Sequence, residues 1–261
     1  LAAGFDKNAD LVDILAAVGF GFAEVGSVTG RACAGNPRPR LWRLPRSQAL
    51  GVYYGLKNDG AETVAAKLRG RHFDLPLGVS IAKTNSPATV DAVPGINDYV
   101  KAFRHFTNIG DYLTVNISCP NAYGGEPFTD PGRFDQLFAR LDKIPTTKPI
   151  FVKLSPDLAH QQVDELLAVV KRHRIHGFVC TNLTKKRNLP QIKEPAPARG
   201  GLSGKIVAPL ADELIEYVYR KTGGQYLVVG SGGVFSAADA YRKIRLGAAL
   251  DVGLERMLDA H

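Results

Sequence analysis

The stretch Thr114-Val115-Asn116-Ile117-Ser118-Cys119-Pro120-Asn121 decides how the rest of the sequence is interpreted. Its first five residues form a β-branched run with polar residues interleaved, which predicts a strand. Pro120 cannot extend a strand ladder and Asn121 favours a turn, so the strand ends beside Cys119. Chemistry takes place at such strand ends in barrels of alternating strands and helices. A lone cysteine is more often a small buried apolar residue, but the flanking asparagines favour a functional Cys119.

The composition is ordinary for a globular protein, with 45% hydrophobic and 22% charged residues, and 261 residues can bury one large core. Three widely spread cysteines argue against a disulfide framework, and no Cys/His spacing is typical of a metal site. The formal net charge of +8 is compatible with nucleic acid, anionic lipid or a small acidic or phosphorylated ligand. Because no RNA- or DNA-binding motif is visible, we expect a small anion, with no metal and no nucleic acid.

Stretches typical of strands alternate with stretches typical of helices along the chain. Strands are expected within 1–4, 20–29, 75–82, 112–118, 149–155, 177–182 and 226–231, and helices after Asp6 or Asn8 and within 59–69, 96–109, 133–141, 158–173, 206–221 and 236–246. Asp59 and Ser236 are expected to cap the helices that begin beside them. This alternation implies a parallel sheet with right-handed crossovers and predicts an α/β fold, a (β/α)8 TIM barrel formed by residues 1–261 as one domain. The irregular stretch 30–54, with prolines among arginines, is long enough to be functional.

The eighth strand of this barrel is missing from the predicted order. Residues 251–260, which follow Leu250, have the apolar spacing of a helix. We therefore expect that a strand and its loop are missing between Leu250 and Asp251. The chain also begins without methionine, so we expect it to be N-terminally truncated, with a segment upstream of Leu1 that would contact a membrane peripherally. No apolar run approaches the ~20 residues of a membrane span.

Polar residues recur at the ends of the predicted strands, and in a barrel they would surround one mouth. They are Ser27, Thr29, Ser80, Lys83, Asn116, Cys119, Lys153, Ser155, Thr181, Asn182 and Ser231. Lys153 lies in an apolar run, where its burial requires an anion, an electron-rich ring or a structural carboxylate. Glycine clusters at 200–204, before a helix, and at 230–233, after a strand, are typical of phosphate sites. The sequence thus predicts a phosphorylated cofactor over the mouth.

Five motifs resemble those of the dihydroorotate dehydrogenase family and occur in the family order. They are Leu1-Ala2-Ala3-Gly4-Phe5-Asp6-Lys7-Asn8, Gly35-Asn36-Pro37-Arg38-Pro39-Arg40-Leu41, Asn116-Ile117-Ser118-Cys119-Pro120-Asn121, Thr181-Asn182 and Gly200-Gly201-Leu202-Ser203-Gly204. The family is an FMN-containing (β/α)8 barrel that oxidises dihydroorotate to orotate in pyrimidine (UMP) biosynthesis. The resemblance therefore implies a flavin-dependent oxidoreductase that binds FMN and takes dihydroorotate as its small-molecule substrate.

The resemblance also implies roles for individual residues. Cys119 would be the catalytic base that removes a proton from carbon 5 of the substrate while a hydride leaves carbon 6 for the flavin. A thiol titrates near ~8.5, so a cysteine beside cations can act as a base near neutrality. Lys7, Asn116, Asn121 and Asn182 would bind the substrate. Ala3, Gly4, Ser27, Ser80, Asn116, Lys153, Thr181, Gly204, Gly232 and Gly233 would bind the cofactor.

Two features of the sequence belong to different classes of this family. The first motif resembles the membrane-associated, quinone-dependent class 2, whereas a cysteine at position 119 resembles the soluble classes, which pass electrons to fumarate or NAD. We expect a quinone as the electron acceptor. We also expect a peripheral position on the cytoplasmic side of the inner membrane (the mitochondrial inner membrane in a eukaryote) or a cytoplasmic location.

Two positions depart from the family pattern. Val52 and Ser80 stand where the family usually has asparagine. Because the Val52 side chain cannot donate a hydrogen bond, orotate binding would be weaker by about 1–3 kcal/mol. An alternative function is therefore that of a related flavin oxidoreductase acting on another reduced pyrimidine. The net charge of +8 leaves a non-catalytic or RNA-binding barrel as a further alternative.

Overall fold

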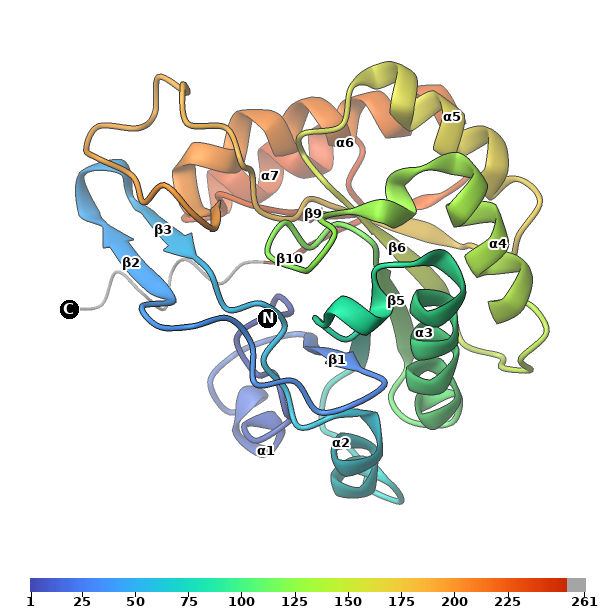
Figure 1. The fold of residues 1–261 in the computed structure, drawn as a ribbon. Helices are drawn as coiled ribbons and strands as arrows, with labels where there is room; N and C mark the ends of the chain where they lie inside the picture. Colours follow the sequence, from blue (N-terminus) through green and yellow to red (C-terminus); the bar gives the residue numbers. More distant parts are fainter. Residues whose placement is uncertain (253–261) are drawn as a thin grey trace.

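Seven parallel strands form the central sheet of the computed structural model, which describes residues 1–252 (Figure 1). In sheet order they are β1 (Ala23–Thr29), β4 (Leu77–Ala82), β5 (Tyr112–Asn116), β6 (Ile150–Leu154), β7 (Gly177–Cys180), β9 (Leu227–Ser231) and β10 (Leu250–Val252). Every residue of β1, β4, β6 and β7 is buried, as expected for parallel strands that are covered on both faces. The sheet curls, so the carboxyl ends of its strands converge.

Helices connect the strands and cover the outer face of the sheet (Figure 1). They are α1 (Val12–Leu15), α2 (Ala61–Leu68), α3 (Ala92–Phe106), α4 (Pro131–Leu141), α5 (His160–Val170), α6 (Ala208–Thr222) and α7 (Ala237–Arg245), with 3-10 turns η1 (Pro45–Ser47), η2 (Pro87–Thr89), η3 (Pro127–Thr129) and η4 (Gly204–Val207). Phe103 and Phe106 of α3 and Phe134 and Phe138 of α4 are fully buried and anchor these helices. Within residues 1–252, no helix has the length and apolar character needed to cross a bilayer. The predicted alternation of strands and helices is confirmed.

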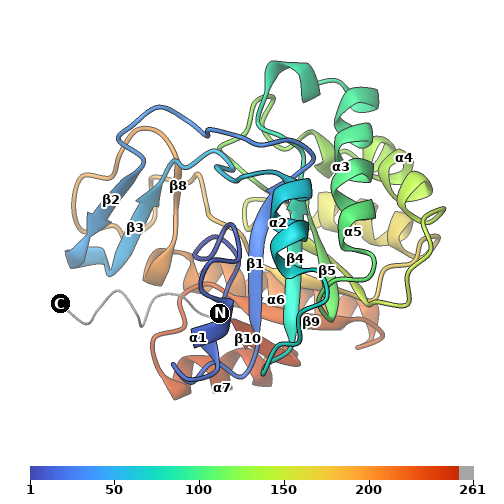
Figure 2. The same cartoon turned by 90° about the horizontal axis from the view of Figure 1, so that it is seen from below.

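The N-terminal residues lie along β1 without forming a regular strand. The Glu24 N–H donates to the Leu1 carbonyl oxygen (2.9 Å), and the Gly4 N–H donates to the Gly26 carbonyl oxygen (2.8 Å). Ala2 belongs to one interior cluster with Val252 of β10, the strand at the opposite edge of the sheet from β1. Figure 2 shows the N-terminus beside β1 and β10. The segment that was predicted as a strand end therefore lies in the gap between β1 and β10, where a complete barrel would have a further strand. Within residues 1–252 the central sheet has seven regular strands.

The structure differs from the prediction near Leu250, where a strand was expected to be missing. Leu250, Asp251 and Val252 form β10 and pair in register with residues 229–231 of β9. The prediction that Asp251 begins a helix is therefore wrong, and the strand expected to be missing at this point is present in a short form. A three-residue strand leaves no alternation to detect, whereas the apolar spacing beyond it favoured a helix. The rest of that predicted helix, 253–260, lies outside the described residues.

A second, antiparallel sheet lies beside the barrel and was not predicted (Figure 1). It consists of β2 (Leu41–Leu44), β3 (Ala49–Val52) and β8 (Gly201–Leu202). Leu44, Leu202 and Ile206 form its small apolar core. Strands of two to four residues show no periodicity, and β8 comes from a loop far along the chain from β3. This sheet covers part of the barrel mouth and contributes residues to the site described below.

The helix starts show which capping predictions held. The Ser236 hydroxyl accepts a hydrogen bond from the Asp239 N–H (3.2 Å), so the predicted cap of α7 is confirmed. The prediction that Asp59 caps α2 is wrong, because α2 begins after Gly60, which has a φ of +87°. The side chain of Asn58 bonds to the backbone just before α2 instead: its Oδ1 accepts a hydrogen bond from the Gly60 N–H at 2.8 Å.

Candidate functional site

A cavity of about 620 Å³ opens at the carboxyl ends of the strands. This volume lies in the range of about 300–1,000 Å³ that is typical of small-molecule sites. The ends of β1, β5, β6, β7 and β9 contribute to its lining, together with the N-terminal segment and β3. Of the predicted site residues, Ala3, Gly4, Lys7, Ser27, Asn116, Cys119, Asn121, Lys153, Thr181, Asn182 and Gly232 line it.

Three predicted site residues lie next to this cavity rather than in its lining. Ser80 is fully buried behind Ser27, and their hydroxyl oxygens are 2.8 Å apart. Gly204 and Gly233 adopt positive φ angles of 78° and 70°. A Cβ atom on Gly233 would lie 2.4 Å from the Cβ of Ala208 and 3.2 Å from the carbonyl oxygen of Gly204. The two glycines thus allow the loop after β9 to pack against the start of α6.

The Asn116 amide is fixed by neighbouring polar groups. Its Nδ2 donates to the hydroxyl oxygen of Ser27 (2.9 Å), and its Oδ1 accepts from the Nδ2 of Asn182 (3.2 Å). Asn182 also donates to the carbonyl oxygen of Ser118 (2.8 Å). These bonds join the ends of β1, β5 and β7, so the two amides are held in defined orientations at the cavity wall.

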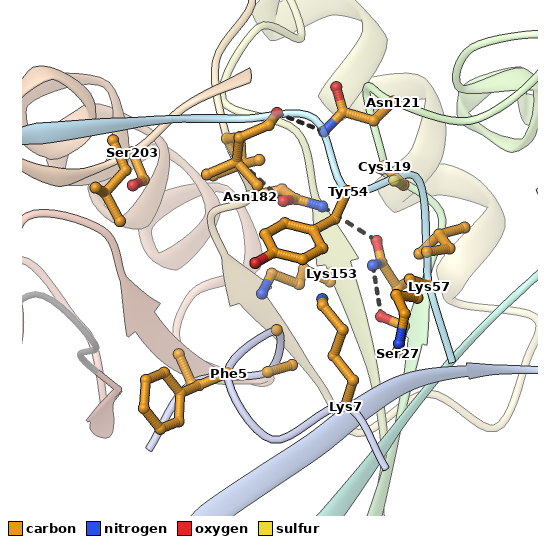
Figure 3. A pocket seen from close by; sticks show the side chains of 18 of the residues that line it. Phe5, Lys7, Ser27, Tyr54, Lys57, Cys119, Asn121, Lys153, Asn182 and Ser203 are labelled. Atoms are coloured by element: carbon orange, nitrogen blue, oxygen red, sulfur yellow. Dashed lines mark hydrogen bonds between the residues drawn. The ribbon is translucent and has the colours of Figure 1, made fainter. Parts of the chain in front are cut away.

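Asn121 connects the loop after β5 to the small sheet. Its Nδ2 donates to the carbonyl oxygen of Val52 at 2.9 Å (Figure 3). Its own carbonyl oxygen accepts from the Nδ2 of Asn36 at 3.0 Å. Val52 therefore takes part through its backbone, while its apolar side chain adds no hydrogen-bonding group to the cavity lining. The family motif that contains Asn36 positions the substrate-side loop indirectly.

Cys119 is partly buried and faces the cavity. Burial raises the pKa of its thiol above the usual value, an effect that the Asn121 N–H and the Lys7 and Lys83 cations counteract and that the Glu126 carboxylate reinforces. Burial therefore favours the protonated thiol over the thiolate. This differs from the expectation that the neighbouring cations bring its titration to neutrality, because loss of hydration outweighs them.

Two lysines direct their ammonium groups toward the same part of the cavity (Figure 3). Burial lowers the pKa of Lys7 to about 8, and the cations of Lys153 and Lys57 contribute. Lys153 is only 6% exposed. It interacts electrostatically with the buried Glu24 carboxylate, which also accepts a hydrogen bond from the Thr114 hydroxyl (2.5 Å). The structural carboxylate considered as an alternative partner of Lys153 is thus Glu24, and the lysine also lines the cavity.

Sequence reasoning missed several residues that line the cavity. Tyr54 and Lys57 follow β3 and extend over the mouth, and Phe5 and Leu41 add apolar surface (Figure 3). The Nζ of Lys7 lies 5.1 Å from the centre of the Tyr54 ring. The only signal for Tyr54 was its place in the irregular stretch 30–54. The cavity as a whole combines cations, a thiol, neutral amides and an aromatic ring, which suits a planar, anionic small molecule.

Comparison with known proteins gives one consistent result. A family model described as dihydroorotate dehydrogenase matches residues 1–255. A protein of Gloeobacter violaceus named dihydroorotate dehydrogenase (quinone) is 40% identical over 251 residues, which are 96% of this chain and 70% of that protein. A protein of the same name from Haloarcula marismortui is 41% identical over 250 residues, with the same coverage.

Solved structures agree with these sequence matches. The crystal structure of DHODH from Eimeria tenella in complex with ferulenol is similar with a TM-score of 0.88 at 28% identity, over 99% of this chain and 75% of that one. The predicted TIM barrel class is confirmed, with seven strands of the barrel sheet among residues 1–252. The names of the bacterial and archaeal relatives also support the predicted class 2. The chain therefore belongs to the dihydroorotate dehydrogenase family.

Proposed function

We propose that this chain oxidises dihydroorotate to orotate in the cavity at the strand ends, with Cys119 as the catalytic base. The observation that supports this most directly is the convergence of the Cys119 thiol, the Lys7 ammonium and the amides of Asn116, Asn121 and Asn182 on one cavity. A planar pyrimidine with a carboxylate group complements this set, because amides recognise the ring and a lysine pairs with the carboxylate.

The residues present fit a flavin, the cofactor class of this family, and we assign it as FMN. Gly232 lines the cavity with a φ of +113°, and a Cβ atom there would lie 2.7 Å from the Cγ1 of Val207. The loop after β9 can thus approach the start of α6 only with glycine, and backbone N–H groups together with a helix dipole suit a phosphate. Gly204, Gly232 and Gly233 would hold the phosphate. Ala3, Gly4, Ser27, Asn116, Lys153 and Thr181 would hold the rest, with Ser80 acting through Ser27.

The chain's own residues divide the chemistry between them. Cys119, as the thiolate, takes the proton from carbon 5 of the substrate. Lys7 pairs with the substrate carboxylate, and the partial loss of hydration that lowers the pKa of Lys7 strengthens this pairing. Asn116 and Asn182 hold the ring in place through amides that the protein has already oriented. When bound, the flavin accepts the hydride that leaves carbon 6.

We also propose a quinone as the electron acceptor. The support is that the relatives from Gloeobacter violaceus and Haloarcula marismortui carry a quinone in their names. Since quinones with long apolar tails dissolve in the bilayer, this acceptor implies a peripheral position at a membrane. Reoxidation of the reduced protein by quinone, fumarate and NAD in turn would identify the acceptor, and preference for fumarate or NAD would contradict this assignment.

The experiment that tests the reaction is anaerobic reduction of the FMN-loaded protein. Dihydroorotate should bleach the flavin absorbance, whereas dihydrouracil, which lacks the carboxylate, should reduce it far more slowly. A flavin that stays oxidised with dihydroorotate would contradict the proposal. Equal or faster reduction by dihydrouracil would favour a related oxidoreductase for another reduced pyrimidine, the alternative that the apolar Val52 side chain in the cavity supports.

A further inference from the structure

A second cavity of about 430 Å³ lies beside the catalytic one. Its lining consists of Arg38, Pro39, Arg40, Leu41, Tyr54 and Lys57. Leu41, Tyr54 and Lys57 also line the catalytic cavity, so the two spaces share one wall. We call this second space the outer cavity. It lies next to the small antiparallel sheet, between the stretch that leads into β2 and the stretch that leaves β3.

The outer cavity is strongly cationic. Arg38, Arg40 and Lys57 contribute three positive charges, and no Asp or Glu among the described residues lines it. None of the three forms an ion pair with a carboxylate in the described part of the chain. The fold thus places cations together without neutralising them, which favours an anion from solution.

The guanidinium group of Arg40 has a hydrogen-bond donor without a partner. Its Nε atom is buried and has no hydrogen-bond partner within residues 1–252. A buried donor without a partner is costly, and a guanidinium is suited to bind the two oxygens of a carboxylate or phosphate at once. Arg40 also lines the outer cavity, so an oxyanion there can bind its guanidinium group.

Lys57 and Tyr54 line both the outer cavity and the catalytic cavity. Lys57 lies close enough to Lys7 for its charge to contribute to the lowered pKa of the Lys7 ammonium. Tyr54 lines both cavities, and the Nζ of Lys7 lies over its ring, 5.1 Å from the ring centre. Lys57 lines both cavities, so it is the cation that the outer cavity, with Arg38 and Arg40, has in common with the catalytic cavity, which Lys7 lines.

We propose that the outer cavity is a binding site for a small oxyanion, held by Arg38, Arg40 and Lys57. Two sources share this chemistry: the carboxylate of the substrate on its way to Lys7, and a phosphate group of a separate ligand. The first source rests on the proposed function, whereas the second does not. Both require the charge of the two arginines rather than their bulk, and this separates the site from a merely structural role.

The test compares two variants of the FMN-loaded protein. Arg38→Gln with Arg40→Gln removes the charge of the outer cavity. Arg46→Gln is the matched control, because Arg46 is exposed, lies nearby in η1 and lines neither cavity. Tm in sodium chloride shows whether each variant folds. If the double variant is unstable, Arg38→Gln alone, at an exposed position, replaces it.

The first measurement is the Tm in inorganic phosphate against sodium chloride of equal ionic strength. Phosphate should raise the Tm of the parent and of Arg46→Gln, and this gain should be absent in the double variant. The second measurement is the anaerobic reduction of the flavin by dihydroorotate. The apparent second-order rate constant should fall about tenfold in the double variant, the lower end of the effect of electrostatic guidance, with the limiting rate unchanged.

The outcomes separate the two sources. A fall in the rate constant, with or without loss of the phosphate effect, supports passage of the substrate carboxylate. Loss of the phosphate effect alone supports a separate phosphate ligand. Equal behaviour of the double variant and Arg46→Gln in both measurements overturns the site. If the parent is not reduced by dihydroorotate at all, the proposed function fails, and the phosphate measurement alone then decides for or against the outer cavity.

Discussion

The Nζ atom of Lys7 lies 5.1 Å from the centre of the Tyr54 ring, so a cation of the N-terminal segment meets an aromatic residue that follows β3. This contact joins the barrel to the small antiparallel sheet above its mouth. It also keeps a partly desolvated ammonium in place without neutralising it, because the ring face attracts the cation but carries no net charge. Lys7 thereby stays available to an anionic ligand.

Replacing Tyr54 should disturb substrate binding through Lys7. In Tyr54→Leu the cation loses the ring, and a cation–π contact is worth about 0.5–2 kcal/mol, so we expect the KM for dihydroorotate to rise about 2- to 30-fold with little change in kcat. Tyr54→Phe keeps the ring and should retain most of the parent's affinity. Steady-state kinetics check this, and an equal rise of KM in both variants would show that the ring does not act on Lys7.

Removing the thiol of Cys119 should slow flavin reduction without releasing the flavin. A positioned base contributes about 10²–10⁴-fold, so Cys119→Ala should reduce its flavin at least ~10²-fold more slowly than the parent. Stopped-flow absorbance under anaerobic conditions measures this rate, and the spectrum of the oxidised protein reports bound flavin. Cys119→Ser should keep some activity with a more alkaline optimum, because an alcohol loses its proton less readily. Equal rates for Cys119→Ala and the parent would exclude this residue from the mechanism.

The pH dependence of the parent should reflect the raised pKa of Cys119. Because the base acts as the thiolate, the reduction rate should increase with pH through a pKa above the usual value of about 8.5. Glu126→Gln removes a negative charge that raises this pKa, so the rise should move to lower pH. Lys83→Met removes a positive charge that lowers it, so the rise should move to higher pH.

The opposite directions of these two shifts are the control for indirect damage. Lys83 also donates to the carbonyl oxygen of Tyr123 at 2.7 Å, and Glu126 pairs with Lys185 at 3.7 Å, so each variant loses one contact of the loop after β5. Loosening of that loop would move both pH profiles in the same direction. Profiles of kcat/KM that shift the same way would therefore show that charge near the thiol is not the cause.

Asp251 should make stability depend on pH. Burial in β10 raises its pKa from 3.8 to about 6, although the Lys243 cation acts in the opposite direction. The folded state therefore favours the protonated carboxyl, and the stability that this proton contributes is present below about pH 4 and lost as pH rises through 6. Asp251→Asn should raise Tm above that of the parent at pH 7.5, and the difference should shrink at pH 4.

Thermal melts between pH 4 and 7.5 check this prediction. Asp74→Asn, at an exposed position, controls for the loss of one negative charge. Both carboxylate oxygens of Asp251 are buried without a hydrogen-bond partner within residues 1–252, so an asparagine loses no bond there. A Tm gain that is the same at pH 4 and 7.5 would rule out the carboxyl as its source.

The sequence was informative where local signals agree with one another. The run of residues 112–118 predicted β5, and the polar residues at and after the end of this strand, Asn116, Cys119 and Asn121, all line the cavity. The sequence was less informative where a short strand forms only by pairing with a strand that is distant in the sequence. β3 is stabilised by pairing with β8, and nothing local in the residues 49–52 indicates that pairing.

The residues near the outer cavity show the same limit. Arg38 and Arg40 stood out as part of an arginine-rich stretch, but their charges could not be assigned to any place in the fold. Contacts between distant segments bring them beside Tyr54 and Lys57: β2 pairs with β3, and the Tyr53 N–H donates to the carbonyl oxygen of Arg40 (2.7 Å). The protonation of Cys119 also could not be predicted, since it depends on how much water the surrounding chain removes.

The sequence by itself determined the alternation of strands and helices, the strand ends at which chemistry takes place and the residue types that they present. These properties follow from periodicity and turn chemistry, which act over a few neighbouring residues. The tertiary structure alone decided that Leu250–Val252 pair with β9 as strand β10, that Tyr54 meets Lys7, and that burial raises the pKa of the Cys119 thiol. Pairing of distant segments and exclusion of water are properties of the whole packed chain, and no local pattern encodes them.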